Sequence, residues 1–311
     1  SFLAISPNGK FLYACTETKL DKPGTVSAFK IDSLTGEITF LNKQTTGGKN
    51  PVHIEIDKKN KYVIVSNYTD PGISVFECNS DGSLKPFSEL IEFKGNSVIS
   101  GRQDKAHIHS SNFSPDNKFL FVTDLGSDKI YVFKFDPESL LTPVDSLTII
   151  TNKGSGPRHF TFHPKESFAY CVEELSGTVS SYGYKEGQLS RLNTYKSYEH
   201  NSEEYASSDI HVSPDGKYLY VANRQDENSI SIFEINPING ELTLISHQET
   251  YGTIPRSFVI SPSGKFLIVA NQTSNNLVVF DRDIETGLLT KIGQTKGLKY
   301  PSSLKIIRYG N

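Results

Sequence analysis

The sequence of 311 residues contains no methionine, no tryptophan and only three cysteines, Cys15, Cys78 and Cys171. An odd number of widely spaced cysteines argues against a disulfide framework and against a cysteine-based zinc site, and it favours a reducing compartment. We therefore expect a cytoplasmic protein. Because methionine is absent even from the first position, we expect an incomplete N-terminus, and an export signal stays an open alternative.

The sequence also lacks a membrane-spanning apolar run and an excess of charge of one sign. It has 32 Lys and Arg residues against 35 Asp and Glu residues, a net charge of −3. Nucleic acids and anionic membranes attract basic surfaces, so neither is expected as a partner. Aromatic residues make up 11% of the chain, which excludes a disordered protein.

A short turn motif recurs six times along the chain. It begins with Ser, Asp or His, usually continues with Pro, and ends with an aromatic residue that opens an apolar run. The copies are Ser6–Phe11, Asp57–Tyr62, Ser114–Phe119, His163–Phe168, Ser213–Tyr218 and Ser261–Phe266, with spacings of 51, 57, 49, 50 and 48 residues. Pro presets one turn dihedral and Gly or Asn tolerates a positive φ, so the motif predicts a hairpin turn.

Each repeat has room for four short strands rich in β-branched and aromatic residues. The fourth and fifth repeats predict strands at 158–163, 168–173, 178–184, 188–195, 209–213, 218–223, 229–235 and 241–247. Four strands repeated about every 50 residues are typical of a β-propeller blade. The absence of tryptophan excludes the Trp-Asp type of propeller. We expect one all-β domain over residues 1–311, with six full blades.

Residues Pro301–Arg308 resemble the first strand of a blade. A single strand is not stable alone, so we expect it to be the innermost strand of a seventh blade. Its three partner strands would precede Ser1 and are not part of this sequence.

Equivalent repeat positions lie on rings around a propeller axis, so the sequence predicts which side chains meet at the channel mouth. At the entry of the first strand most blades carry Ser or Val, whereas three carry His109, Arg158 and Arg256. The next position holds His53, His159 and Asp209 in three blades. We also place His211 near this mouth. His53 and His211 are equally compatible with strand histidines that have only structural hydrogen bonds.

Two arginines without a repeated carboxylate partner indicate an anion clamp, so we assign function to Arg158 and Arg256. Glu174 occupies a position that the turn does not require to be acidic. The adjacent carboxylate of Glu173 would raise the pKa of Glu174, as expected of a general base. The Asn and Asp residues that end the second strands recur in most blades, which indicates turn chemistry for them, and His163 takes the place of a turn Ser.

The stretch Gly154–Pro164, with the residues Ala169–Leu175 that follow, resembles the seven-bladed propeller lactonase family, which includes propeller-type 6-phosphogluconolactonases and carboxy-muconate lactonizing enzymes. Lys105–His109, Asp209–Gly216 and Ile254–Phe258 resemble it too. The resemblance covers essentially the whole chain. It implies seven blades and a metal-free site with His109, Arg158, Glu174 and Arg256, and with Arg224 as a weaker addition. His107 replaces His109 if the alignment shifts by two residues.

These observations lead to a lactone hydrolase hypothesis, with 6-phosphoglucono-δ-lactone as the simplest substrate. Arg158 and Arg256 would bind the phosphate or the oxyanion, and Glu174 or His109 would act as the base. Arg224, His159, Asp209, His211 and His107 would contact the substrate. No metal or organic cofactor is implied, and we expect a monomer or a weak homodimer. A lactonizing cycloisomerase and a non-catalytic propeller that binds proteins are the alternatives.

Overall fold

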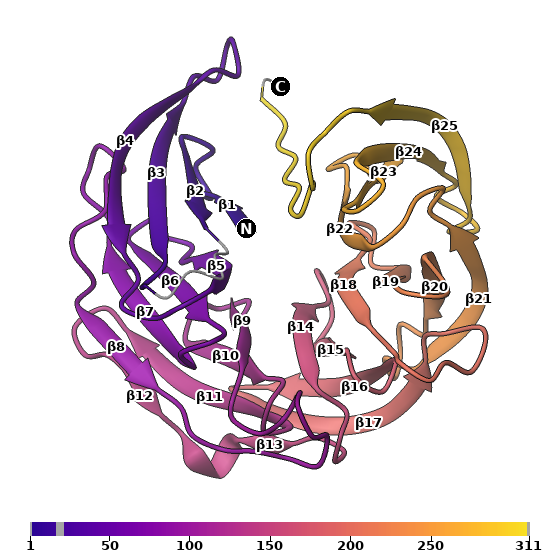
Figure 1. Cartoon of the computed structure of the whole chain (residues 1–311), viewed down its shortest axis with the longest axis horizontal. Coiled ribbons are helices and arrows are strands. Elements are labelled where there is room, and N and C mark those ends of the chain that lie inside the picture. Colours follow the sequence, from indigo (N-terminus) through magenta and orange to yellow (C-terminus); the bar gives the residue numbers. More distant parts are fainter. Residues whose placement is uncertain (1, 17–21, 310–311) are drawn as a thin grey trace. The chain divides into compact units, whose positions relative to one another are not determined.

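The computed structural model describes residues 2–16 and 22–309. Contacts between Cα atoms divide the chain into two compact units, one of residues 1–153 with 307–311 and one of residues 154–306. Each unit contains three antiparallel sheets, coloured indigo to magenta and magenta to yellow in Figure 1. The described secondary structure is otherwise limited to one short 3₁₀ helix, η1 (Asp145–Leu147). That the whole chain forms a single domain stays a prediction.

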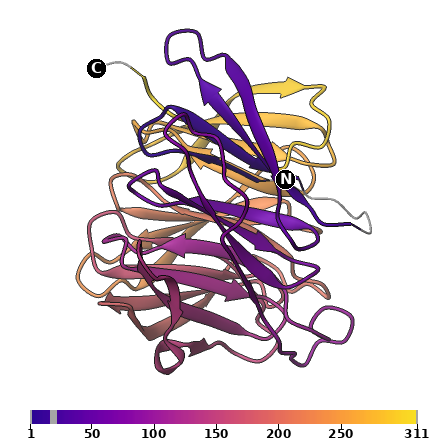
Figure 2. The ribbon, with the colours of Figure 1, turned by 90° about the vertical axis from the view of Figure 1, so that its left-hand side faces the viewer.

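The first unit carries three of the sheets in chain order. The first sheet contains β1 (Phe2–Ile5), β2 (Phe11–Cys15), β3 (Thr25–Ile31) and β4 (Ile38–Thr45). The second contains β5 (Pro51–Ile56), β6 (Tyr62–Asn67), β7 (Gly72–Glu77) and β8 (Glu89–Glu92). The third contains β9 (Ile108–Phe113), β10 (Phe119–Asp124), β11 (Lys129–Asp136), β12 (Leu140–Pro143) and β13 (Ile149–Ile150). Figure 2 shows these sheets, coloured indigo to magenta, one beside the next. Strand β5 contacts both β1 and β9.

The second unit repeats the same arrangement three times. The fourth sheet contains β14 (Pro157–Phe162), β15 (Phe168–Glu173), β16 (Thr178–Lys185) and β17 (Gln188–Lys196). The fifth contains β18 (Ser207–Val212), β19 (Tyr218–Asn223), β20 (Ser229–Ile235) and β21 (Leu242–Glu249). The sixth contains β22 (Pro255–Ile260), β23 (Phe266–Asn271), β24 (Asn276–Arg282) and β25 (Leu289–Lys296). Among their first strands, β18 packs against both β14 and β22. The predicted strands of the fourth and fifth repeats are confirmed to within two residues at each end.

The recurring turn joins the first and second strands of each sheet, as predicted. In the first copy, Ser6 Oγ accepts a hydrogen bond of 2.9 Å from the Phe11 amide, and Gly9 has a positive φ of 71°. Asn117 adopts the same conformation without glycine, with a φ of 61°. His163 takes the part of the turn Ser, because its Nδ1 accepts the amide hydrogen of Glu166 at 2.8 Å. The structural interpretation of His163 is therefore confirmed.

The hydrophobic core lies between neighbouring sheets. In the first unit, one cluster joins the first and second sheets and another joins the second and third. In the second unit, two clusters join the three sheets in the same way. Ile54, Ile210 and Phe258, which the repeat places between blades, are buried in these clusters. Apolar side chains fill the interfaces between sheets, so polar side chains that can form a functional site lie at the ends of the strands.

The strand predicted at Pro301–Arg308 does not form. Residues 301–309 have no regular secondary structure. A β-strand is defined by its hydrogen bonds to a neighbouring strand, and none of the described strands pairs with this segment. Across the residues that the structure describes, the chain therefore builds six sheets.

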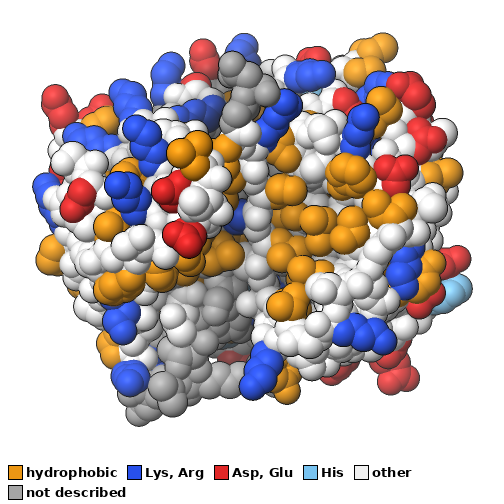
Figure 3. All heavy atoms as spheres, turned by 90° about the horizontal axis from the view of Figure 1, so that it is seen from above, with side chains coloured by type: hydrophobic (Ala, Val, Ile, Leu, Met, Phe, Trp, Pro, Cys, Tyr) orange, Lys and Arg blue, Asp and Glu red, His pale blue; other side chains and the backbone are white. Residues whose placement is uncertain are grey.

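Basic and acidic side chains are mixed on the face drawn in Figure 3, with hydrophobic side chains between them. This agrees with the small net charge of −3. In the described part of the chain, no helix is long and apolar enough to cross a membrane.

Candidate functional site

A cluster of charged side chains lies where β14 begins and β15 ends. The Arg158 side chain donates a hydrogen bond from Nε to Glu174 Oε2 at 2.8 Å. Arg224 Nη2 lies 3.0 Å from the same carboxylate oxygen. Arg158 is only 2% exposed, and Glu174 is also buried. Glu174 therefore joins two guanidinium groups that come from neighbouring sheets.

A bulge brings Arg158 to this place. In the pairing of β14 with β15, Pro157 lies opposite Glu173 and His159 opposite Val172, so Arg158 is an extra residue. Such a bulge turns its side chain out of the regular alternation of a strand. Equivalent register shifts occur at Arg256 in β22 and at His109 in β9.

The glycine-rich segment before Arg158 has a local structural reason. Gly156 has a φ of 64°, which favours glycine, and an added Cβ would lie 2.6 Å from Leu175 Cγ. The Glu174 amide donates to the Gly156 carbonyl at 2.8 Å. The tight approach of this segment to the end of β15 places Arg158 and Glu174 next to each other.

The electrostatics of the cluster are dominated by arginine. Burial and the nearby Arg224 charge lower the pKa of Arg158 to about 9, and Arg256 acts in the same direction. Glu174 and Asp209 oppose this shift. The charges that act on Arg158 thus include those of two further guanidinium groups and two carboxylates. Such a cluster is suited to an anion, because guanidinium groups pair with carboxylates and phosphates.

A second set of polar side chains extends from Arg158 through three sheets. Arg158 Nη1 donates to His159 Nε2 at 3.2 Å, and His159 Nδ1 lies 2.9 Å from Asp209 Oδ1. His211 Nε2 lies 3.4 Å from Asp209 Oδ2. The Phe258 amide of β22 donates to the same oxygen of Asp209 at 3.1 Å. The structure therefore brings six of the predicted site residues into one connected network: Arg158, Glu174, Arg224, His159, Asp209 and His211.

The titration of this network follows from burial. Burial and the nearby Arg158 charge lower the pKa of His159 to about 4, so its imidazole is neutral at pH 7. Burial alone would raise the pKa of Asp209, but His211 and His159 hold it well below its ordinary value. Asp209 is consequently an ionised acceptor between two imidazole rings.

Glu173 has a different environment from Glu174, although the two are adjacent. Its carboxylate accepts hydrogen bonds from Thr178 Oγ1 at 2.6 Å and from Ser180 Oγ at 3.0 Å, both on β16. It occupies the strand-end position that other sheets give to Asn or Asp. At that position Asn223 Nδ2 donates to the Ser197 carbonyl at 2.7 Å. Asn271 bonds in the same way to the Thr250 carbonyl at 2.9 Å, whereas Asp124 accepts from the Gly126 and Ser127 amides of its own turn. The turn-chemistry interpretation therefore holds for Asp124, while Asn223 and Asn271 hold the connection that precedes their own sheet.

The predicted histidines of the first unit have their own surroundings. The His107 ring stacks on Tyr68 at 4.3 Å, and its Nδ1 lies 3.0 Å from the Tyr68 carbonyl oxygen. His109 is buried, and its ring meets the same tyrosine edge-on at 5.6 Å. His53 is buried against Phe2, with ring centroids 4.4 Å apart. The proposed roles of His107 and His109 stay predictions.

Sequence reasoning missed Tyr198, which holds Arg224 in place. Its hydroxyl donates to the Arg224 carbonyl at 3.0 Å and accepts from the Ala206 amide at 2.9 Å, while Arg224 Nε donates to the Ala206 carbonyl at 2.8 Å. Tyr198 lies between β17 and β18 and has no equivalent in the turn motif. Only its position after a strand of the repeat distinguishes it in the sequence. Among the described residues, no group of His, Cys, Asp and Glu side chains has the arrangement of a metal site.

Comparison with known families agrees with this architecture. Residues 1–306 match the family described as lactonase, 7-bladed β-propeller. The chain belongs to this family. It is therefore an all-β propeller of four-stranded blades, as predicted, and the lactonase resemblance is confirmed.

Individual relatives of this lactonase-family chain carry related names. A 6-phosphogluconolactonase of Formosa agariphila is 49% identical over 314 residues, covering 100% of this chain and 89% of the relative. A 6-phosphogluconolactonase of Bacillus subtilis is 37% identical over 312 residues, covering 99% of this chain and 87% of the relative. The solved structure of a periplasmic gluconolactonase of Pseudomonas aeruginosa is similar with a TM-score of 0.92 at 31% identity, covering 98% and 87% of the two chains.

Proposed function

We propose that this protein hydrolyses a phosphorylated sugar lactone, 6-phosphoglucono-δ-lactone, to 6-phosphogluconate. The observation that carries the proposal is the gathering of Arg158, Arg224 and Arg256, in which the charges of the other two arginines lower the pKa of Arg158. The names of the two relatives with 49% and 37% identity support the same substrate. The reaction would belong to the oxidative pentose phosphate route.

The arginines supply the binding energy and the charge stabilisation in this proposal. A phosphate or a developing oxyanion would be held by Arg256 and Arg224, which are partly exposed, while the buried Arg158 adds positive charge behind them. Positioned cations stabilise the negative charge that grows on the lactone carbonyl oxygen as water attacks. The ring oxygen then leaves, which gives the hydroxy acid.

Glu174 is assigned a positioning role. Its Oε2 is engaged by Arg158 and Arg224 at 2.8 and 3.0 Å. Both cations stabilise its negative charge, so the carboxylate is held as an ion-pair partner rather than presented to a water molecule. This differs from the sequence-based hypothesis, in which Glu174 or His109 is the general base and the adjacent Glu173 raises the pKa of Glu174.

The number of blades, the cellular compartment and the oligomeric state are part of the same proposal. The family description supports a seven-bladed form of the propeller. The three free cysteines, two of them buried, support a reducing compartment such as the cytoplasm. We propose a monomer or a weak homodimer.

The test is a pH-stat assay of acid release from freshly prepared 6-phosphoglucono-δ-lactone. The wild-type protein is expected to exceed the spontaneous rate, and Arg158→Ala to lose kcat/KM by about 10²-fold or more. Arg191→Ala, which changes an exposed arginine of β17, is the matched control and should keep the wild-type rate. A wild-type rate equal to the spontaneous rate overturns the proposal.

A thermal-shift titration tests the phosphate preference separately. 6-Phosphogluconate should raise Tm in a concentration-dependent way, because a ligand that binds only the folded state stabilises it. Gluconate at the same concentrations should have a much smaller effect. Equal shifts with both ligands would show that the arginine cluster does not recognise the phosphate.

A further inference from the structure

We propose that His211, oriented by Asp209, is the general base of the reaction. This inference rests on the proposed function and names the residue that activates the water. It assigns His159 to a positioning role between Asp209 and Arg158, and it gives both histidines roles other than binding the anion.

The first step of the argument is the set of hydrogen bonds at Asp209. Its Oδ1 lies 2.9 Å from His159 Nδ1 and accepts from the Ile210 amide at 3.1 Å. Its Oδ2 accepts from the Phe258 amide at 3.1 Å and lies 3.4 Å from His211 Nε2. Backbone and side-chain donors from three sheets thus hold one buried carboxylate in a single orientation. A carboxylate fixed in this way can orient an imidazole ring.

The second step concerns the protons of the two rings. An ionised carboxylate only accepts hydrogen bonds, so each histidine presents an N–H to Asp209. His159 therefore carries its proton on Nδ1, and its Nε2 accepts from Arg158 at 3.2 Å. His211 carries its proton on Nε2. In the neutral ring the lone pair of His211 is then on Nδ1, the nitrogen that faces away from Asp209.

The third step is accessibility. Both nitrogens of His159 are engaged, and its side chain is only 8% exposed. The His211 side chain is 34% exposed. Of the two rings that Asp209 orients, His211 is the one that a substrate water can reach. A general base must come within hydrogen-bond distance of the proton it removes.

The fourth step places His211 near the anion site. Its ring packs edge-on against Phe258, with centroids 4.8 Å apart. Phe258 follows Arg256 by two residues in β22, which is about 7 Å along a strand. A lactone whose phosphate binds at Arg256 can extend along β22 and bring its carbonyl carbon next to His211.

The reaction step balances without a further reactant. His211 Nδ1 takes a proton from water while the water oxygen bonds to the lactone carbonyl carbon. The carbonyl becomes an oxyanion, which reforms the C=O bond as the bond to the ring oxygen breaks. The ring oxygen takes the proton from the His211 imidazolium. The product is the open-chain hydroxy acid, and His211 is neutral again.

The test measures kcat, KM and chemical rescue in the His211→Ala variant of the full chain. We expect kcat to fall about 10²- to 10⁴-fold, the usual contribution of a general base, with KM changed far less. Added imidazole should restore part of kcat in proportion to its concentration, and it should leave the wild-type rate unchanged. Restoration by a free base is not expected if His211 has only a structural role.

Asp209→Asn separates the orienting group from the base. It is expected to lower kcat without rescue by imidazole, because the His211 ring still fills its site in the wrong orientation. His200→Ala, at an exposed histidine, is the matched control and should keep the wild-type kcat. Thermal unfolding of each variant verifies that it is folded.

A failure of the His211 assignment can be distinguished from a failure of the proposed function. If the wild-type protein does not accelerate hydrolysis, the proposed function fails. If the wild-type protein is active and His211→Ala keeps kcat within about twofold, or loses it without any rescue by imidazole, the assignment of His211 is overturned.

Discussion

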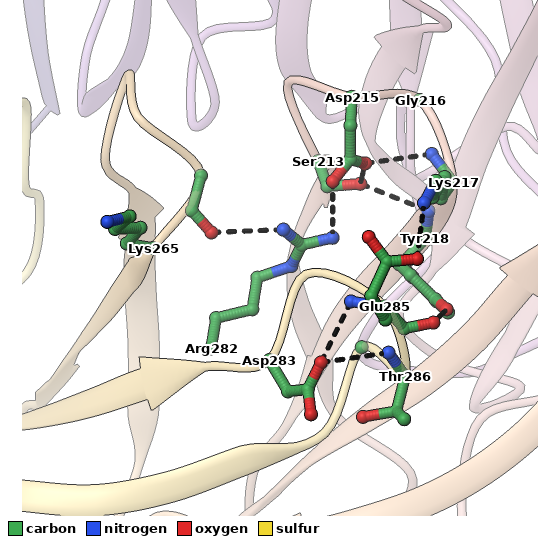
Figure 4. Close-up of polar contacts among 12 residues, drawn as sticks. Ser213, Asp215, Gly216, Lys217, Tyr218, Lys265, Arg282, Asp283, Glu285 and Thr286 are labelled. Atoms are coloured by element: carbon green, nitrogen blue, oxygen red, sulfur yellow. Dashed lines mark hydrogen bonds and ion pairs between the residues drawn. The ribbon is translucent and has the colours of Figure 1, made fainter.

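Arg158 and Arg282 are two buried arginines of the second unit, each 2% exposed and each paired with a carboxylate, Arg158 with Glu174 of its own sheet and Arg282 with Asp215 of the neighbouring sheet. Their surroundings differ. Arg282 Nη2 lies 2.9 Å from Asp215 Oδ2, its Nε donates to Tyr220 Oη at 2.7 Å, and its Nη1 donates to the Gly264 carbonyl at 3.0 Å. Figure 4 shows Arg282 reaching from β24 to the Ser213–Tyr218 turn. One cation and one carboxylate balance each other there.

The cluster around Arg158 gathers several cations. Arg224 and Arg256 both lower the pKa of Arg158, and Glu174 is shared between Arg158 and Arg224. Burial of an arginine is therefore a poor indicator of function by itself, because a paired arginine can serve only to join two sheets. The informative observation is that several guanidinium groups lie close enough to act on one another, which favours an anionic ligand.

Among the variants that test the difference between the surroundings of Arg158 and Arg282, Arg256→Ala is expected to have the largest effect. Removing one of the three cations should lower kcat/KM by about 10²- to 10³-fold, which corresponds to about 3–4 kcal/mol of transition-state stabilisation. The measurement is steady-state lactone hydrolysis, with Tm followed in parallel. If Arg256→Ala retains wild-type kcat/KM, the gathering of arginines has no catalytic importance.

Arg282→Ala should have the opposite profile. It removes one partner of a buried ion pair and three hydrogen-bonding groups, so the free energy of unfolding should fall by about 3 kcal/mol. KM should not change, because Arg282 lies at the turn end of the strands. Urea unfolding and lactone kinetics measure the two quantities. A raised KM in a folded Arg282→Ala protein would remove the distinction between the two arginines.

His159→Gln tests the pH dependence of the Arg158 network. The pKa of His159 is about 4 in the folded protein, below the ordinary value of about 6.5 expected in the unfolded chain. Between these values the unfolded chain binds more protons, so the folded state loses stability as pH falls from about 6.5 to 4, by about 3 kcal/mol at most. Asp209 keeps its charge over this range, because its pKa is well below the ordinary value.

The measurement is the free energy of unfolding of wild-type protein and His159→Gln at several pH values between 7.5 and 4.5. The variant should show a shallower loss of stability on acidification than the wild type. Parallel curves for the two proteins would mean that His159 is protonated in the folded state.

The smallest effect is expected at the edge of the Arg282 cluster. Tyr218 donates a hydrogen bond from its hydroxyl to the Glu285 carbonyl, and its ring lies 5.3 Å from the Arg282 guanidinium. Tyr218→Phe removes the hydroxyl and keeps the ring, so the loss should be about 1 kcal/mol of unfolding free energy with unchanged kcat/KM. A loss as large as that of Arg282→Ala would show that the hydroxyl, rather than the ion pair, stabilises this cluster.

The recurring turn made much of the fold predictable. Its Pro and its Gly or Asn encode local dihedrals, so the first and second strands could be placed to within two residues. Glu173 and Glu174 could not be separated in this way. They are adjacent, but one faces hydroxyl groups of its own sheet and the other faces arginines from two sheets. Local patterns carry no information on which neighbouring sheet a side chain meets.

The prediction at Pro301–Arg308 illustrates the same limit. The segment has the residue pattern of an inner strand, yet a strand needs a hydrogen-bonded neighbour, and the pattern cannot provide one. Likewise, the ring positions of Arg158 and Arg256 were readable from the repeat, whereas the bulges that turn these side chains out of register were not.

The amino-acid sequence alone determined the repeat, the all-β class and the family, because turn dihedrals and strand patterning are local properties. Tertiary structure alone decided that Glu174 holds two arginines, that Asp209 orients His211 and that Arg282 joins two sheets. Apart from the contact of Asp209 with His211, which lie two residues apart in β18, those roles depend on contacts between residues about 15 to 70 positions apart, which strand pairing and the packing of one sheet on the next bring together.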